Sequence, residues 1–144
     1  MTRLREELAA AAYPPGGAVV GIGIDLCEIE RIAEALARHP GRFLERVCVP
    51  GEVRRPPDSP RFAEHVAGLF AAKEAAMKAL GTGMRGVAFR EIAVARAPGG
   101  PPRLALLGRA RARADALGVV AAHVTITHSR TEAAAVVLLL APSA

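Results

Sequence analysis

Two carboxylates, Asp25 and Glu74, have surroundings that suggest chemistry. Asp25 ends an otherwise apolar run, and Glu74 lies within a long helical pattern. Each also has an ordinary interpretation: Asp25 would cap the helix that begins near Cys27, and Glu74 would pair with Lys78 in the favoured i,i+4 order. For Asp25 the chemical interpretation is a metal ligand, because Mg²⁺ is usually held by one or two carboxylates and completes its shell with water and substrate phosphate. The residues alone leave both interpretations open.

Phosphate is the second ligand that this region suggests. Lys73 falls inside the apolar arc of the same helical pattern, where a charge must be paired or used. Gly81-Thr82-Gly83 follows, with Arg85 nearby, and small residues let backbone N–H groups approach a phosphate. A plain helix stop with a loop is the alternative interpretation. Walker and Rossmann loops precede a helix, whereas this loop follows one, so neither nucleotide fingerprint applies.

His128 is the one histidine with a suggestive position, because it follows Thr127 at the end of a predicted strand. A turn histidine and a site residue are both open interpretations there. The other three histidines, His39, His65 and His123, have no motif context and are interpreted as surface or packing residues.

The elements that must position these residues follow from hydrophobic periodicity. Helices are predicted over residues 2–12, 28–38, 61–80 and 108–117, with a short helical turn near residues 43–44. Strands are predicted over residues 18–26, 87–95, 103–107, 119–127 and 133–140. Helices interspersed with hairpin-like strand pairs predict an α+β fold. We expect residues 1–17 to form an extension, a short helix followed by a Pro/Gly linker, and residues 18–144 to form one domain.

Composition narrows the class of protein further. The chain has 144 residues, 51% of them hydrophobic, which suits one domain with a core; its net charge of +5 favours an acidic or phosphorylated partner. With aromatics at only 3%, single-stranded nucleic acid is a poor partner. Cys27 and Cys48 are expected to be buried free thiols. No stretch is long enough for a membrane span and the first residues lack a signal-peptide core, so a cytoplasmic protein is predicted.

Four ordered motifs resemble those of the holo-acyl-carrier-protein synthases, over about residues 18–141. They are Gly21 to Ile32 (GIGIDLCEIERI), Arg42 to Arg46 (RFLER), Phe70 to Gly83 (FAAKEAAMKALGTG) and Val124 to Ser129 (VTITHS). The resemblance implies the 4′-phosphopantetheinyl transferase fold, a small antiparallel sheet packed with a long helix. It also implies transfer of 4′-phosphopantetheine from coenzyme A to a serine of an apo acyl carrier protein of fatty-acid, and hence lipid, or polyketide biosynthesis, with release of adenosine 3′,5′-bisphosphate.

The resemblance assigns roles by position. Asp25 and Glu74 would hold Mg²⁺, and Asp25, Glu74 and Lys78 would form the catalytic group. Either Glu74 or a water that it orients would take the serine proton. Coenzyme A would be bound by Lys73, Lys78, Gly81, Thr82, Gly83, Arg85, Thr127 and His128.

The resemblance also implies protein partners. Arg31 and Arg42 match the arginines that face the acidic carrier protein, and guanidinium groups suit carboxylates because they bind them in bidentate fashion. A homotrimer is expected, with active sites between subunits, the Asp25 side and the Glu74 side of one site being completed across an interface.

Four departures separate the chain from the family pattern. Leu69 stands where many members have Arg, so a phosphate contact is missing or comes from Arg85 or Arg90. Val49 replaces the usual Thr three positions before the matching Glu52, Thr125 replaces Ser, and residues 1–17 are additional. The alternatives are a non-catalytic coenzyme A-binding protein with a regulatory or interaction role, against which the retained Asp25 and Glu74 argue, and a small basic nucleic-acid binder, which lacks any recognised motif.

Overall fold

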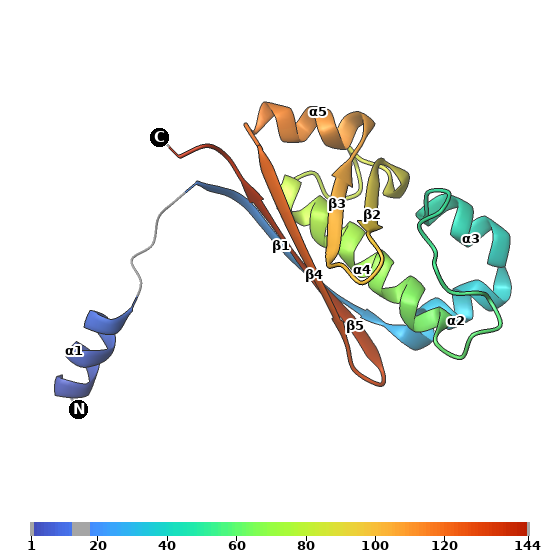
Figure 1. Cartoon of the computed structure of the whole chain (residues 1–144), viewed down its shortest axis with the longest axis horizontal. Coiled ribbons are helices and arrows are strands. Elements are labelled where there is room, and N and C mark those ends of the chain that lie inside the picture. The colour runs from blue at the N-terminus through green and yellow to red at the C-terminus, as the bar shows by residue number, and fades with distance from the viewer. Residues whose placement is uncertain (1, 13–17, 144) are drawn as a thin grey trace.

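The computed structural model describes residues 2–12 and 18–143. Its elements in chain order are α1 (Thr2–Ala11), β1 (Val19–Glu28), α2 (Ile29–Arg38), α3 (Pro40–Val47), α4 (Phe62–Leu80), the 3-10 helix η1 (Phe89–Glu91), β2 (Ile92–Arg96), β3 (Pro102–Leu106), α5 (Gly108–Ala116), β4 (Ala121–His128) and β5 (Glu132–Leu140). The predicted α+β class is confirmed, and α2, α3 and α4 lie on one side of the main sheet (Figure 1). The linker predicted at residues 14–17 falls outside the described residues, and the division into extension and domain stays a prediction.

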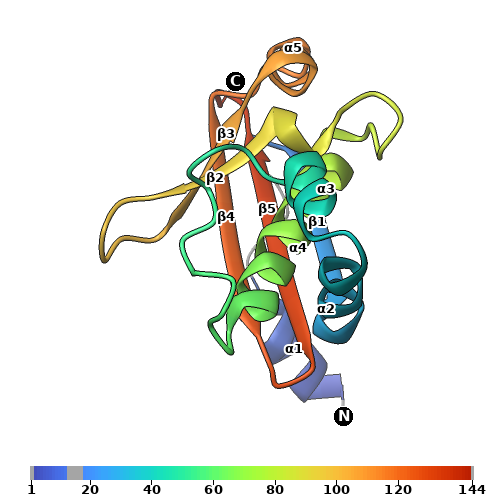
Figure 2. The same cartoon turned by 90° about the vertical axis from the view of Figure 1, so that its right-hand side faces the viewer.

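The main sheet is antiparallel, with β5 in the centre between β1 and β4. Its register sets Asp25 of β1 opposite Ala135 of β5, and Ala135 opposite Ile126 of β4. A second, two-stranded sheet is the β2–β3 hairpin, which extends beyond β4 in Figure 2. The predicted strand pairs are therefore both present as hairpins.

Side-chain alternation gives the main sheet two different faces. Gly21, Gly23, Asp25 and Cys27 of β1 point toward α4, while the residues between them point away. Ile22, Ile24 and Leu26 are 64–66% exposed, although they are large and apolar. Val136 and Leu138 of β5, which are partly exposed, lie opposite Ile24 and Ile22 and therefore on the same face. We call the set the open face; it consists of Ile22, Ile24, Leu26, Val136 and Leu138.

Helix α4 crosses the covered face from β4 to β1. Near its start, a Cβ added to Gly68 would lie 3.1 Å from the side chain of Ile126 on β4. Farther along, a Cβ added to Gly23 of β1 would lie only 1.9 Å from the carbonyl oxygen of Ala75. Since that distance is far inside van der Waals contact, β1 needs glycine where the helix backbone rests on it.

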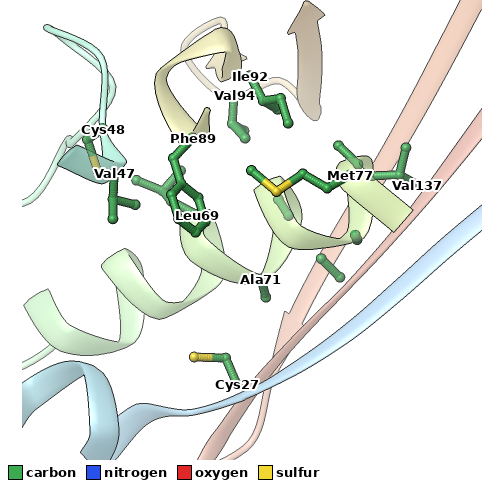
Figure 3. Close-up of a cluster of buried hydrophobic side chains, with 14 of the residues drawn as sticks. Cys27, Val47, Cys48, Leu69, Ala71, Met77, Phe89, Ile92, Val94 and Val137 are labelled. Carbon is green, nitrogen blue, oxygen red and sulfur yellow. The ribbon is translucent and has the colours of Figure 1, made fainter. Parts of the chain in front are cut away.

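The core surrounds α4 on both of its long sides. In Figure 3, Phe89, Ile92 and Val94 cover one side of the helix, while Cys27 reaches it from β1. Cys27 and Cys48 are buried free thiols, as predicted. Within residues 2–12 and 18–143, no helix has the length and apolar character that a membrane span needs.

Two sequence predictions differ from the structure. Strand β1 continues through Asp25 to Glu28, and the residue before α2 is Glu28, so Asp25 does not cap that helix. The strand predicted over residues 87–95 begins only at Ile92, because residues 89–91 form η1. There the Glu91 carboxylate accepts the N–H of Ala88 at 2.8 Å, which closes the short turn.

Candidate active site

Asp25 and Lys78 form the centre of the candidate site. Asp25 is 8% exposed, and its Oδ1 accepts a hydrogen bond from Lys78 Nζ at 3.0 Å. Lys78 Nζ also donates to the carbonyl oxygen of Ile24 at 2.9 Å. The other carboxylate oxygen, Asp25 Oδ2, is buried without a hydrogen-bond partner in the described part of the chain. Lys78 thus pairs with Asp25 across elements rather than with Glu74 along its own helix.

Glu74 lies beside this pair, one helical turn before Lys78. Burial and the negative charge of Asp25 raise the pKa of Glu74, while the charges of Lys78 and Arg31 oppose the rise. One chain therefore brings Asp25 and Glu74 together by itself. The two carboxylates therefore need no neighbouring subunit to meet, because α4 rests directly on β1, while active sites between the subunits of a homotrimer stay a prediction.

The two carboxylates have the features of a site for a hard cation. Asp25 Oδ2 lacks a partner, and a neighbouring like charge already disfavours ionisation of Glu74. Positive charge placed between them would relieve both conditions. Among residues 2–12 and 18–143, no three His, Cys, Asp or Glu side chains gather as a metal cage. A cation here would therefore depend on water and substrate for its remaining ligands, as Mg²⁺ commonly does.

The glycine loop begins at the end of α4. Gly81 and Gly83 have φ of 74° and 56°, and the Thr82 N–H donates to the carbonyl oxygen of Met77 at 3.2 Å. This is the helix stop that the sequence predicts. Arg113 Nε donates to the carbonyl oxygen of Leu80 at 2.9 Å and so ties α5 to the end of α4. Arg85 is exposed in the same loop.

Lys73 does not have the position expected of a phosphate ligand. Its side chain is fully buried, and Nζ lies 2.9 Å from Glu52 Oε1. The ammonium group also donates to the carbonyl oxygens of Phe89 and Ile92. An ammonium has three donors, so all of them are used inside the protein. Lys73, which was predicted to contact a coenzyme A phosphate, therefore pairs with Glu52 inside the protein instead.

A basic cleft of about 280 Å³ opens on the other end of α4. We define it by its lining residues, which are Glu52, Arg54, Arg55, Glu64, His65, Gly68, Leu69, Val94, Arg96, Ile126 and His128. His128 Nε2 lies 3.0 Å from Glu64 Oε1, and the Arg54 N–H donates to His65 Nε2 at 3.0 Å. Burial, followed by the charges of Arg55, Arg96 and Arg54, lowers the pKa of His65. The cleft suits an anionic ligand.

The cleft lies apart from the carboxylates within one chain, since neither Asp25, Glu74 nor Lys78 lines it. Thr127 and His128, which were expected to line one pocket, point to opposite faces of the sheet because they are consecutive in β4. His128 faces the cleft. Thr127 lies opposite Ala134 and lies on the side of the open face.

Three arginines of the basic cleft escaped the sequence interpretation. Arg54, Arg55 and Arg96 line it together with Leu69, whereas Arg85 and Arg90 do not. The first two stand in a Pro-rich loop and the third near a hairpin tip, where no periodic pattern indicates a shared site. The arginines that share the cleft with Leu69 thus differ from Arg85 and Arg90, which were expected to supply the phosphate contact missing at Leu69.

The two arginines expected to face a carrier protein lie on neighbouring helices. Arg31 is exposed on α2 and Arg42 is exposed on α3. Arg31 stands close enough to the carboxylates for its charge to oppose the rise in the pKa of Glu74. A surface formed by α2 and α3 therefore adjoins the candidate site, as Figure 2 illustrates for the helices.

Comparisons with known proteins show which proteins the chain resembles. A family model described as the 4′-phosphopantetheinyl transferase superfamily matches residues 21–137. The chain is 52% identical over 122 residues to holo-[acyl-carrier-protein] synthase of Nitratidesulfovibrio vulgaris, covering 84% of this chain and 98% of that protein. Two crystal structures of such synthases have a TM-score of 0.71. The Helicobacter pylori structure, in complex with coenzyme A, is 32% identical and covers 82% of this chain and 98% of its own chain. The Bacillus anthracis structure, in complex with CoA (3′,5′-ADP), is 36% identical and covers 88% of this chain and 100% of its own chain.

Proposed function

Because the chain belongs to the 4′-phosphopantetheinyl transferase superfamily, as an enzyme of the holo-[acyl-carrier-protein] synthase type, we propose that it transfers 4′-phosphopantetheine from coenzyme A to a serine hydroxyl of an apo acyl carrier protein. Adenosine 3′,5′-bisphosphate would be the second product, and the carrier would serve fatty-acid or polyketide synthesis. The observation that carries the proposal is the buried Asp25, with one oxygen paired to Lys78 and the other without a partner, beside Glu74.

Mg²⁺ is the proposed cofactor, held by Asp25 and Glu74. When bound, it would supply positive charge that neutralises the diphosphate of coenzyme A and the leaving phosphate. The fit rests on the unpartnered Asp25 Oδ2 and on the repulsion between the two carboxylates.

Lys78 and Glu74 are the proposed chemical groups of this chain. Lys78 keeps half of its side chain exposed while its ammonium is anchored to Asp25, so it can offer a donor to a phosphate oxygen. Glu74, or a water that it orients, would accept the proton of the carrier serine, and a carboxyl with a raised pKa holds that proton better. Gly81, Thr82, Gly83 and Arg85 begin one turn after Lys78 and would adjoin the phosphates.

The basic cleft is the proposed site for the phosphorylated nucleotide end of coenzyme A, with His128 as one lining residue. Arg54, Arg55 and Arg96 give it cationic groups suited to phosphate. Within one chain this cleft is separate from Asp25 and Glu74. In the proposed homotrimer with active sites at subunit interfaces, the cleft of one copy would meet the carboxylates of its neighbour.

The open face is the surface through which copies would meet. It exposes three large aliphatic side chains of β1, Ile22, Ile24 and Leu26, in a single row. Contiguous apolar surface of this kind marks interaction sites on folded proteins. The acidic carrier would approach the separate surface of α2 and α3, where Arg31 and Arg42 are exposed.

Incubation with coenzyme A, Mg²⁺ and a panel of apo carrier proteins tests the proposal, with intact carrier mass as the measurement. We expect a gain of one phosphopantetheine, which chelator, Asp25→Asn and Glu74→Gln each reduce by about 100-fold or more in rate. Asp115→Asn is the matched control, because Asp115 is an exposed aspartate paired with Arg111 on α5. Bound coenzyme A without transfer to any carrier would instead favour the non-catalytic alternative.

A further inference from the structure

Glu52 and Lys73 form a buried ion pair that the proposed chemistry does not use. Both side chains have 0% exposure, and Lys73 Nζ lies 2.9 Å from Glu52 Oε1. The carboxylate also accepts the N–H groups of Val49, at 3.1 Å, and Val94, at 2.6 Å. Lysine and glutamate are almost never fully buried unless paired, and desolvating two charges is costly. Such a pair contributes little net stability, so its role is sought in the segments that it holds together.

The pair connects three segments that form the walls of the basic cleft. Lys73 lies on α4, one turn after Leu69 of the cleft. Glu52 lies in the loop that supplies Arg54 and Arg55. Its bond to the Val94 N–H fixes β2 two residues before Arg96. Arg54 and Arg55 thus closely follow Glu52 in the chain, and Arg96 closely follows Val94, whose N–H Glu52 binds.

Lys73 reinforces the same connection from the helix. It donates to the carbonyl oxygens of Phe89 and Ile92, at the two ends of the segment that leads into β2. Figure 3 shows Phe89, Ile92 and Val94 together on one side of α4. The charge of Lys73 also compensates the carboxylate of Glu52, a cleft residue whose buried charge would otherwise oppose an anionic ligand.

We propose that Glu52 and Lys73 are a positioning pair for coenzyme A: together they fix Arg54 and Arg96 against α4 and neutralise the acidic group in the wall of the basic cleft. This inference rests on the proposed function. It differs from a direct phosphate contact by Lys73 in one measurable respect. A direct contact is lost with the ammonium, whatever stands at position 52, whereas the effect of a positioning pair depends on both partners.

The experiment compares Lys73→Met, Glu52→Gln and the double variant with the wild type. Lys73→Met leaves an unpaired buried carboxylate, and we expect it to raise the Kd and KM for coenzyme A by about 10–100-fold, with kcat and the carrier KM little changed. In the double variant no charge is left unpaired, and the amide that Glu52→Gln introduces keeps an oxygen for a backbone N–H. We expect its Kd for coenzyme A to stay raised like that of Lys73→Met, because the connection between α4, the loop and β2 is missing although no charge is buried alone, and Glu52→Gln by itself should raise the Kd similarly.

The control is the pair of Glu91 and Arg109, which joins a carboxylate to a cation and to two backbone N–H groups in the same way, but is more exposed and lies outside the cleft. The Glu91 carboxylate accepts the backbone N–H groups of Ala88 and Arg109 and pairs with the Arg109 guanidinium at 2.8 Å. Glu91→Gln with Arg109→Met should leave the Kd for coenzyme A unchanged. An equal rise in this control would overturn the inference, since any broken ion pair would then have the same effect.

Calorimetric titration of coenzyme A, after circular dichroism has confirmed folding, separates the outcomes. A folded Glu52→Gln variant that binds coenzyme A as tightly as the wild type would overturn the positioning role in favour of direct contact by Lys73, whose ammonium it keeps, while transfer by the wild type would keep the proposed function. If Lys73→Met fails to fold, Glu52→Gln and the double variant decide, because a double variant that binds as tightly as the wild type would overturn the positioning role. A wild type that neither binds nor uses coenzyme A would overturn both proposals.

Discussion

His65 reports on the charge of the basic cleft. Its Nε2 accepts the N–H of Arg54 at 3.0 Å, and burial together with the charges of Arg55, Arg96 and Arg54 lowers its pKa below the usual 6.5. Protonation would add a like charge to the cleft and would remove the acceptor for Arg54. An anion bound in the cleft should therefore favour the imidazolium form.

This cause predicts a pH dependence of stability. Because the folded pKa of His65 is lowered, the unfolded state binds the proton first, and the free energy of unfolding should fall as pH drops below about 6.5 and through the folded pKa. His65→Gln, which keeps an acceptor but does not titrate, should flatten this part of the profile. Urea denaturation at about pH 7.5 and about pH 5.5 measures the effect.

Coenzyme A supplies the second test of the same residue. NMR titration of the imidazole should show that the ligand raises the pKa of His65, since phosphate introduces negative charge. A free-protein pKa at or above 6.5 would contradict the basic surroundings, and an unchanged pKa upon saturation would place the ligand elsewhere.

At the residue scale, sequence reasoning found the carboxylates but misjudged their partners. Asp25 is conspicuous because a carboxylate after an apolar run is unusual, whereas Glu74 is assigned to the site by the family resemblance. The Asp25–Lys78 bond joins two elements far apart in the chain, and no local spacing indicates it. Glu52 was identified only as a motif match, and its pairing with Lys73 depends on how the Pro-rich loop folds over α4.

At the scale of elements, the contact between β1 and α4 is set by a glycine. Gly23→Ala would place a Cβ 1.9 Å from the Ala75 carbonyl oxygen and 2.8 Å from the Ala79 nitrogen. The backbone of α4 must then move away from β1. We expect a loss of about 1–3 kcal/mol or more in the free energy of unfolding, together with weaker Mg²⁺ binding, because Asp25 and Glu74 separate. Urea denaturation and cation titration measure the two effects.

Gly41→Ala is the matched control for this substitution. Gly41 lies in α3, and a Cβ there meets nothing within 4 Å. Since alanine favours the helix over glycine by about 1 kcal/mol, stability should be unchanged or slightly raised. Equal losses in both variants would show that close packing on β1 is not the cause.

The elements themselves were predicted well where one pattern dominates. Alternation indicated β1, and its small residues proved to be the side on which α4 rests. The strand predicted from residue 87 failed because Val87 and Phe89 alternate locally but belong to a turn that Glu91 closes. The end of β1 was missed for a similar reason, as pairing with β5 extends it to Glu28, opposite Glu132.

For the whole molecule, the open face predicts self-association. Ile24 is 64% exposed at the middle of the row, so Ile24→Glu would bring a carboxylate into the proposed interface, at a cost of several kcal/mol. We expect the wild type to sediment as a trimer and the variant as a folded monomer, with transfer reduced by about 10-fold or more because the basic cleft of a neighbour is missing.

Leu107→Glu is the control for that experiment. Leu107 is 47% exposed and apolar but precedes α5, away from the open face. It should leave the sedimentation coefficient unchanged. A wild type that sediments only as a monomer and is fully active would refute the trimer, and with it the need for a neighbouring cleft.

The central place of β5 has a consequence for synthesis on the ribosome. β1 is translated near the beginning of the described domain, yet its only strand partner in the described part of the chain spans residues 132–140. Until those residues leave the exit tunnel, the nascent chain carries an unpaired apolar strand, and pairing over such a separation is slow. The sheet is thus completed only when the last strand has emerged, and until then β1 is open to wrong pairings.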